Sequence, residues 1–271
     1  MGYVDDLFSV KGKVALVTGA ATGIGRMAAT GLVQGGARVL IASRKGDACE
    51  AVAAELNALG AAGSAEGFAA DVSTEEGIAA LVEEVKSRTD TLHILVNNAG
   101  VSWGAKLEEF PYAAWAKVLN VNVTGLFHLT RELLPMLEKD ASIDDPARIV
   151  NLGSVMGTQP MADGAYSYTA SKAAVHHLTR TLASEFGERR ITVNAFAPGP
   201  FQSRMTAFAT ATDEQAADVA SRNPSGRIGR VDDIAGSTLY LCSRAGSYVT
   251  GAILPIDGGE SVHHGLRLFK E

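Results

Sequence analysis

Apolar runs of strand length alternate with helical stretches along the whole chain. The runs that we predict as strands lie at residues 13–18, 37–42, 66–70, 92–97, 147–153, 190–196 and 252–256. Between them, the clearest helical patterns lie at 26–34, 46–59, 74–88, 112–137 and 168–187. This alternation is typical of a parallel sheet with helices on both faces. We therefore predict an α/β fold with a single Rossmann-like, doubly wound sheet of about seven strands, and a ligand site at its carboxyl edge.

Bulk properties narrow the class of protein. The 271 residues show no linker, internal repeat or low-complexity tract, so we predict one domain over residues 1–271. A net charge of −6 without a basic block disfavours nucleic acid as a partner. No apolar run reaches the length of a membrane span, and the N-terminus lacks a basic signal region. Cys49 and Cys242 lie far apart in sequence, so we expect no disulfide framework and a reducing, cytoplasmic location.

A glycine-rich loop, Thr18-Gly19-Ala-Ala-Thr-Gly-Ile-Gly25, joins the first predicted strand to the first long helix. At a helix N-terminus, unpaired N–H groups and the helix dipole attract a pyrophosphate. We expect Gly19 to permit the tight turn, Gly23 to let the backbone approach the phosphates, and Gly25 to let helix and strand pack closely. An ordinary strand-to-helix turn is the alternative. The residues assigned to cofactor binding in this loop are Gly19, Thr22, Gly23, Ile24 and Gly25.

Tyr168 and Lys172 lie four residues apart near the start of a predicted helix, on one face of it. Since a nearby ammonium favours phenolate, we expect Lys172 to lower the pKa of Tyr168 and suit it to proton transfer with a substrate oxygen. Ser154 adds a hydroxyl just after a predicted strand. Tyr166 is rejected as the acid because the residue four positions on is the uncharged Ala170. Taken alone, the tyrosine–lysine spacing is compatible with plain helical packing.

Together these motifs resemble the short-chain dehydrogenase/reductase family along nearly the whole chain. The glycine loop, Asn97-Asn-Ala-Gly100, Ser154, Tyr168-x-x-x-Lys172 and Pro198-Gly199 follow one another in the family's order. Within the family, the chain is most similar to 3-oxoacyl reductases of the type associated with rhamnolipid synthesis, through residues 97–104, residues 197–206 and the acidic insert before Pro146. The resemblance implies an NADP-dependent enzyme that reversibly reduces a ketone to a secondary alcohol.

The resemblance also implies a cofactor site. NAD-preferring relatives carry an acid where Ser43 stands; here Ser43 leaves space and Arg44 offers a planar fork for a 2′-phosphate, so we expect NADP(H). A solvated surface arginine is the alternative for Arg44. Asp71 is placed beside the adenine, although it could instead support a turn in which Ser73 caps the next helix. The other implied contacts are Val72, Asn98 (adenosine ribose), Ala99, Gly100, Tyr168, Lys172 (nicotinamide ribose), Pro198, Gly199, Phe201 and Ser203.

By the same resemblance, Tyr168 is the general acid of the reduction, Ser154 orients the carbonyl and Lys172 holds the ribose. Asn122 matches the asparagine that holds a water behind the lysine; Asn120 competes for this role, but the N-x-x-G-x-F spacing favours Asn122. The expected substrate contacts are Trp103, Ser154, Met156, Tyr168 and Phe201, in an apolar pocket with Val101, Val155, Met161 and Met205.

No metal is required in this scheme. His176 and His177 are adjacent on a predicted helix and diverge by about 100°, so they cannot chelate together. The expected partner is a small carbonyl or alcohol substrate: a 3-oxoacyl group, or a cyclic, sugar-like or xenobiotic compound. A non-catalytic dinucleotide sensor is a further alternative, which the complete set of Asn122, Ser154, Tyr168 and Lys172 argues against.

Three expectations concern surfaces. Residues 202–226 resemble a mobile lid over the substrate, with an ordinary surface helix and loop as the alternative. We expect a homotetramer, because helices such as 112–137 and 168–187 pair between subunits in the family. The acidic segment 138–145 leads us to expect poor docking of an acidic acyl carrier beside the site, with Arg189 and Arg190 as opposing charges. Free or coenzyme-A-linked ketones, or small cyclic ketones, should then react at least as well as carrier-bound 3-oxoacyl groups.

Overall fold

Seven parallel strands form one sheet in the order β3-β2-β1-β4-β5-β6-β7. The computed structural model describes residues 2–160, 164–203, 206 and 210–263. The order reverses direction between β1 and β4, as in doubly wound sheets, so the predicted fold class is confirmed. The strands are β1 (Val14–Thr18), β2 (Arg38–Ser43), β3 (Ser64–Ala69), β4 (Ile94–Asn97), β5 (Ala147–Leu152), β6 (Ile191–Pro198) and β7 (Ile253–Ile256).

Helices connect these strands, and their limits differ from the predicted ones by a few residues. The α-helices are α1 (Tyr3–Leu7), α2 (Gly23–Gln34), α3 (Gly46–Asn57), α4 (Glu75–Arg88), α5 (Tyr112–Leu119), α6 (Leu126–Glu138), α7 (Tyr166–Phe186), α9 (Asp213–Ser221) and α10 (Val231–Cys242). Shorter helical turns are η1 (Leu107–Glu109), η2 (Asn120–Gly125), η3 (Val155–Gly157), η4 (Arg244–Gly246) and η5 (Glu260–Val262).

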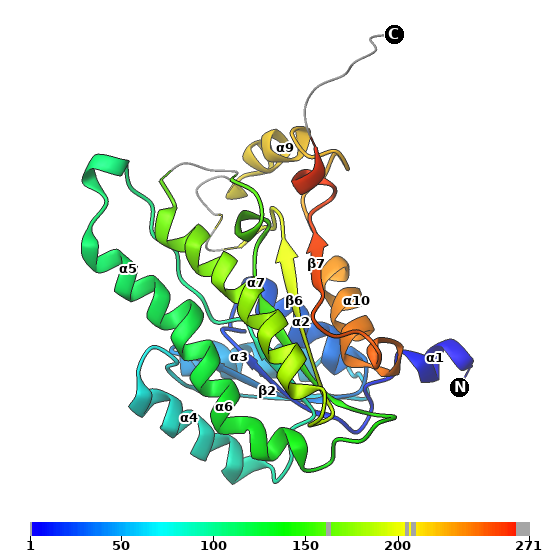
Figure 1. Cartoon of the computed structure of the whole chain (residues 1–271). Coiled ribbons are helices and arrows are strands. Elements are labelled where there is room, and N and C mark those ends of the chain that lie inside the picture. Colours follow the sequence, from blue (N-terminus) through cyan, green and yellow to red (C-terminus); the bar gives the residue numbers. More distant parts are fainter. Residues whose placement is uncertain (1, 161–163, 204–205, 207–209, 264–271) are drawn as a thin grey trace.

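The two faces of the sheet bury separate hydrophobic clusters, because successive side chains of a strand point to opposite faces. In β1, Ala15 and Val17 join the cluster under α2, α3 and α10, whereas Leu16 joins the cluster under α4, α6 and α7. The sheet is therefore the middle layer of three, and side chains reach a ligand only from the strand ends (Figure 1).

The helix predicted over 112–137 is interrupted by a π-helical segment, η2, between α5 and α6. Such segments are rare and frequently mark functional sites. A Cβ on Gly125, the last residue of η2, would run into the carbonyl group of Val72, so glycine lets this segment pack closely on the chain after β3. Asn122 and Gly125 of this segment are buried, and Asn122 thereby brings a polar side chain into the interior.

The carboxyl edge of the sheet carries the region predicted as a lid. The arrows of β6 and β7 point toward α9, which lies beyond the strand ends (Figure 1). Of residues 202–226, the structure describes 202, 203, 206 and 210–226. They include α9, and an isolated bridge pairs Phe201 with Gly229. No helix within the described ranges is long and apolar enough to cross a membrane.

Candidate active site

The glycine loop lies between the end of β1 and the start of α2, and close neighbours leave no room for side chains there. Gly19 has a φ of +67°, and a Cβ on it would lie 2.9 Å from the Ala99 Cα. Gly23 has a φ of +59°, and its Cβ would lie 3.2 Å from the Ser203 Cβ. At Gly25 the space is filled by the Asn98 amide and the Gly19 carbonyl oxygen, rather than by the strand that we expected to pack there.

Asn98 braces this loop from the end of β4. Its Nδ2 donates to the carbonyl oxygens of Thr18 (2.8 Å) and Gly19 (3.0 Å). In return, the Thr18 hydroxyl oxygen accepts the backbone N–H groups of Asn98 and Ala99, both at 3.1 Å. Both amide hydrogens of Asn98 therefore hold the glycine loop in shape. The resemblance implied only a contact of Asn98 with the adenosine ribose, so this structural role is additional.

The N-terminus of α2 is free to bind an anion. Its N-cap residue, Thr22, makes no side-chain capping bond, and the first turn contains no acidic residue. By contrast, Thr74 caps α4 and Thr212 caps α9 through their hydroxyl groups. The amide groups of the first turn, next to glycines without room for a Cβ, fit a pyrophosphate, which the helix dipole would favour.

Ser43 is the last residue of β2, and Arg44 directly follows it. The Ser43 hydroxyl accepts the Lys45 N–H at 3.2 Å, and the Arg44 side chain is exposed. Among the ion pairs formed by described residues, none involves Arg44. Its guanidinium is thus available to a 2′-phosphate at this edge.

Asp71 lies across from Arg44 and shapes a turn. Its Oδ1 accepts the Ser73 N–H at 2.9 Å. Burial opposes ionisation, but the hydrogen bonds from Ser73 and the charge of Arg44 outweigh it and keep the pKa of Asp71 below its ordinary value. The expectation that Ser73 caps the next helix was wrong by one residue: α4 is capped by Thr74, whose hydroxyl accepts the Gly77 N–H at 3.1 Å.

Tyr168 and Lys172 lie one turn apart on α7, as predicted. The Lys172 Nζ is buried, donates to the Leu152 carbonyl oxygen at 2.6 Å and lies 5.5 Å from the centroid of the Tyr168 ring. The Ser154 side chain lies near the Tyr168 phenol and lowers its pKa, and its Oγ accepts the Met156 N–H at 3.2 Å. The structure therefore brings together the hydroxyl, phenol and ammonium groups at the ends of β5 and α7. Tyr166 instead packs its ring against Phe110, with centroids 5.2 Å apart, which confirms a packing role.

The electrostatics of this pair differ from the expectation. Burial raises the pKa of Tyr168 above its ordinary value, and the hydrogen bond from Ser154 only partly offsets this. Burial also lowers the pKa of Lys172 to about 8. Lys172 has thus lost its charge before the phenol would ionise, so the expectation that it lowers the pKa of Tyr168 was wrong for the protein without ligands. Tyr168 is instead held protonated at neutral pH, the state that a proton donor requires.

Asn122, in the π-helical segment, is buried, whereas the competing Asn120 is exposed. The Asn122 Oδ1 accepts the Val101 N–H at 2.8 Å, and its Nδ2 donates to the Val101 carbonyl oxygen (3.0 Å) and the Ser171 hydroxyl (2.9 Å). The side chain therefore holds the strand end after β4 against α7. Both amide hydrogens of Asn122 are therefore engaged, and its Oδ1 keeps a second acceptor position.

The segment after β6 places its residues differently from expectation. A Cβ on Gly199 would lie 2.9 Å from both the Asp257 Cα and the Glu260 Oε2, so only glycine fits there. The Phe201 ring is 2% exposed and packs with Ala28 and Ile234. The expectation that Phe201 contacts substrate was therefore wrong for its side chain, because the residue is buried under α10 and its carbonyl oxygen accepts the Thr206 hydroxyl.

The substrate side is bordered by the loop after β4. Trp103 is half-exposed, and the Lys117 Nζ lies 4.9 Å from the centroid of one of its rings. Met161 and Met205, expected in the same pocket, lie outside the described residues. A cavity of about 450 Å³ lies not at Tyr168 but between α2, α9 and the start of α10. Within the described part of the chain, no group of three metal-ligating side chains was found.

The acidic segment 138–145 lies at the opposite edge of the sheet. It joins the end of α6 to the start of β5, so it is at the amino edge, and Glu138 pairs there with Arg189 at 2.7 Å. We expected this segment to lie beside the active site. Within a single subunit that expectation was wrong, because α6 and α7 both run from the carboxyl edge toward the amino edge.

Comparison with known proteins agrees with this geometry. A family model described as Enoyl-(Acyl carrier protein) reductase matches residues 19–261. The chain is 46% identical to the rhamnolipids biosynthesis 3-oxoacyl-[acyl-carrier-protein] reductase of Pseudomonas aeruginosa, over 93% of this chain and 97% of that protein. It is 34% identical to gluconate 5-dehydrogenase of Gluconobacter oxydans, over 95% and 98% of the two chains.

Solved structures give the same result. The complex of Pseudomonas aeruginosa RhlG with NADP superimposes with a TM-score of 0.89 at 44% identity, covering 94% of this chain and 99% of that one. The match of fold, motif order and sequence spans nearly the full length of both chains. The protein therefore belongs to the short-chain dehydrogenase/reductase family.

Proposed function

We propose that this protein is an NADPH-dependent ketoreductase that converts a ketone to a secondary alcohol, reversibly. The observation that carries the proposal is the convergence of Ser154, Tyr168 and Lys172 at the carboxyl edge, beside the glycine loop. Two neighbouring hydroxyl groups, on Ser154 and Tyr168, can both face one carbonyl oxygen, which is where negative charge develops during reduction.

In this scheme each residue has one task. Bound NADPH supplies the hydride to the carbonyl carbon. Tyr168, held protonated by burial, gives its proton to the oxygen, and Ser154 orients that oxygen by a hydrogen bond. Lys172 binds the ribose hydroxyls, and Asn122 keeps the loop after β4 packed on α7.

The choice of NADPH over NADH rests on Ser43 and Arg44. Ser43 is half-buried, keeps its hydroxyl on the local turn and carries no charge that would repel a phosphate. Arg44 is exposed next to it. Relatives with solved structures bind NADP, which agrees with this assignment.

The preferred substrate in this proposal is a 3-oxoacyl thioester. The reductase of Pseudomonas aeruginosa is named for such a substrate, and Trp103 and Met156 offer apolar surface beside the site. A polyol or sugar-acid ketone is the second candidate, since gluconate 5-dehydrogenase is also a full-length relative and Lys117 presents a cation next to Trp103.

A substrate panel tests these assignments. Purified protein would be assayed for NADPH oxidation with a 3-oxoacyl thioester on coenzyme A and on acyl carrier protein, a 2-enoyl thioester, a keto-sugar acid and a cyclic ketone. The largest kcat/KM is expected for a 3-oxoacyl thioester and no turnover for the enoyl compound, because Ser154 and Tyr168 address an oxygen atom. NADPH binding without turnover of any carbonyl would support a sensor instead.

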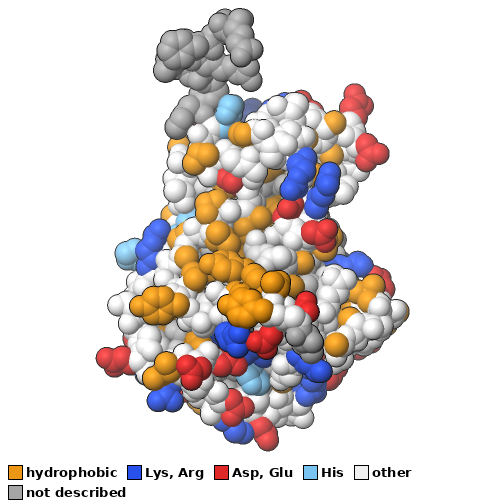
Figure 2. Space-filling view, turned by 90° about the vertical axis from the view of Figure 1, so that its right-hand side faces the viewer, with side chains coloured by type: hydrophobic (Ala, Val, Ile, Leu, Met, Phe, Trp, Pro, Cys, Tyr) orange, Lys and Arg blue, Asp and Glu red, His pale blue; other side chains and the backbone are white. Residues whose placement is uncertain are grey.

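We also propose a single catalytic domain that acts as a homotetramer. Hydrophobic side chains gather across the face on which α10 and β7 lie (Figure 2). Val231 and Tyr240 of α10 are exposed, and so is Tyr248 in the segment between α10 and β7. β7 is at the edge of the sheet, with no strand beyond it among the described residues. Such a face favours a twofold contact between copies. Light scattering that reports one chain's mass at micromolar concentration would contradict it.

The region 202–226 is proposed to act as a lid, since its described residues include α9 at the carboxyl edge and Ser203, which closely approaches Gly23 of the glycine loop. The cytoplasmic location stays a prediction.

A further inference from the structure

We propose that His176 is a positioning residue that holds Ser154 in line with Tyr168 and Lys172. The inference rests on the proposed role of Ser154 in orienting the carbonyl. His176 itself would touch neither substrate nor cofactor.

His176 continues the row of functional residues on α7. It lies four residues after Lys172, which lies four residues after Tyr168, so the three side chains share one face of the helix. That face looks toward the end of β5 and the turn η3, where Ser154 lies. The imidazole is 3% exposed, so its polar atoms need partners inside the protein.

The ring holds both ends of η3. Its Nε2 accepts the backbone N–H of Ser154 at 3.4 Å, and its Nδ1 lies 3.3 Å from the Thr158 hydroxyl. Because Nε2 accepts a hydrogen bond, the ring proton of the neutral imidazole is on Nδ1 and is donated to Thr158. One planar group therefore sets the distance between the residue before the turn and the residue after it.

Two glycines enclose the ring. A Cβ on Gly153 would lie 2.6 Å from the His176 Cδ2, and a Cβ on Gly157 would lie 2.8 Å from the Cε1. The backbone on either side of the turn is thus in direct contact with the imidazole. The Gly153 N–H also donates to the Phe196 carbonyl of β6 at 2.8 Å, so the ring and the sheet clamp the same segment.

The surroundings keep the imidazole neutral. Arg180 and Lys172 face it from α7, and the hydroxyls of Ser154 and Thr158 belong to the opposing turn. Burial, with the charges of Arg180 and Lys172, lowers the pKa of His176 to about 4. A protonated ring would turn Nε2 into a donor against the Ser154 N–H, so the neutral form is the one that holds the turn.

His176→Leu tests the inference, because leucine fills similar space without an acceptor. We expect kcat per NADPH-binding site to fall about 10- to 100-fold, as small displacements of a reacting group can cost that much, while the Kd for NADPH stays within about twofold. His176→Gln, which can present an oxygen to the Ser154 N–H, should recover most of the rate. His177→Leu is the matched control: its side chain is exposed on the same helix, and its kcat should equal that of the wild type.

A double-mutant cycle separates positioning from general damage. If His176 acts through Ser154, His176→Leu should lower kcat less than about twofold in a Ser154→Ala background, because coupled residues are non-additive. An equal loss in both backgrounds, or an unchanged kcat in His176→Leu, overturns the inference. If Ser154→Ala itself retains full activity, the proposed site is wrong instead. If His176→Leu folds poorly, Thr158→Val is the second test, because it removes the hydroxyl that binds the His176 Nδ1. This variant should lower kcat severalfold without changing the affinity for NADPH. An unchanged kcat overturns the inference.

Discussion

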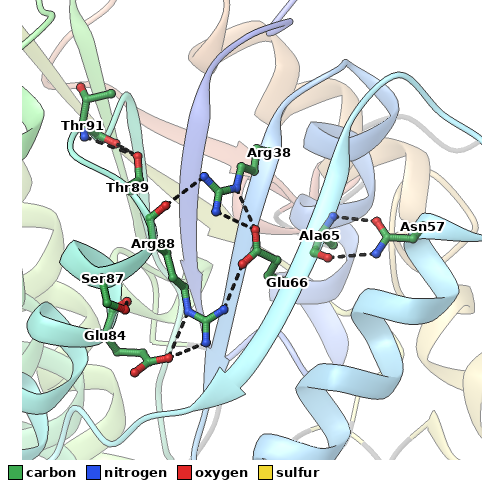
Figure 3. A network of polar contacts seen from close by, with 9 residues as sticks. All are labelled: Arg38, Asn57, Ala65, Glu66, Glu84, Ser87, Arg88, Thr89 and Thr91. Carbon is green, nitrogen blue, oxygen red and sulfur yellow. Dashed lines mark hydrogen bonds and ion pairs between the residues drawn. The ribbon is translucent and has the colours of Figure 1, made fainter.

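The two edges of the sheet use polar residues in opposite ways. Near the amino edge, the Glu66 carboxylate of β3 accepts hydrogen bonds from the Arg38 guanidinium of β2 (2.8 Å) and the Arg88 guanidinium of α4 (2.9 Å) (Figure 3). Arg88 also forms an ion pair with Glu84. Burial would raise the pKa of Glu66, but the hydrogen bonds and charges of Arg38 and Arg88 outweigh it and lower that pKa. Every charge in this network has an opposite charge beside it.

At the carboxyl edge, three ionisable groups on α7 have no opposite charge as a hydrogen-bond partner. Lys172 is bound only to a carbonyl oxygen, Tyr168 to a serine hydroxyl and His176 to a backbone N–H. Burial therefore shifts each of them toward its neutral form. The difference teaches that the amino edge is built to hold elements together, whereas the carboxyl edge keeps reactive groups free for a ligand. Four predictions test the contrast.

The largest effect is expected at Tyr168. Tyr168→Phe keeps the ring but removes the proton, so kcat should fall about 10²–10⁴-fold, while NADPH binding survives. Tyr166→Phe is the control, since that ring packs on Phe110, and it should keep most of the activity. Steady-state rates and NADPH titrations measure both. Equal losses in the two variants would remove Tyr168 from its proposed role.

Arg44 should come next. Arg44→Ala removes a charge-assisted contact to the 2′-phosphate, so kcat/KM with NADPH should fall roughly ten- to hundredfold. The value with NADH, which lacks that phosphate, should change little. Exposed Lys45 is the neighbouring comparison, and Lys45→Ala should have a smaller effect. A parallel drop with both cofactors would show that Arg44 acts on folding or on the loop rather than on phosphate.

The pH dependence of reduction should follow Lys172. Its pKa is about 8, so the ammonium is charged below pH 8 and neutral above it. With Tyr168 still protonated there, kcat/KM for NADPH should be level near neutrality and fall above about pH 8, by up to about tenfold per pH unit. Lys172→Arg stays charged, so its lower rate should lack this limb. A wild-type profile that stays flat to pH 10 would contradict the assignment.

The smallest effect is expected at the amino edge. Glu66→Gln should lower the free energy of unfolding by about 1 kcal/mol at pH 7, since the pairs are partly exposed, and leave kcat unchanged. The folded-state pKa of Glu66 is lowered, so its contribution is present above its unfolded pKa of 4.5 and is lost as pH falls through the folded value. Denaturant unfolding at pH 7 and pH 3 should show the difference shrinking in acid. A loss of kcat would mean that the two edges are coupled.

Much of this protein was predictable from local patterns. Apolar runs bounded by glycines and turns located the seven strands within a few residues, because a strand between two layers of helices must be apolar over its whole length. The structure buries Asn122, exposes Asn120 and packs Tyr166 on Phe110, as the spacing along each element favoured. The catalytic roles of these positions stay predictions.

What the sequence determined by itself is the order of strands and helices and the residues that meet at the carboxyl edge, because topology carries every strand end there. Only the tertiary structure decided what each side chain does once it arrives. Four features arise between segments distant in sequence: the burial of Phe201 under α10, the binding of the Asn98 amide to the glycine loop, the lowered pKa of Lys172 and the contact of His176 with Ser154. Burial and hydrogen-bond partners set these roles, and neither is encoded in the spacing of residues along the chain.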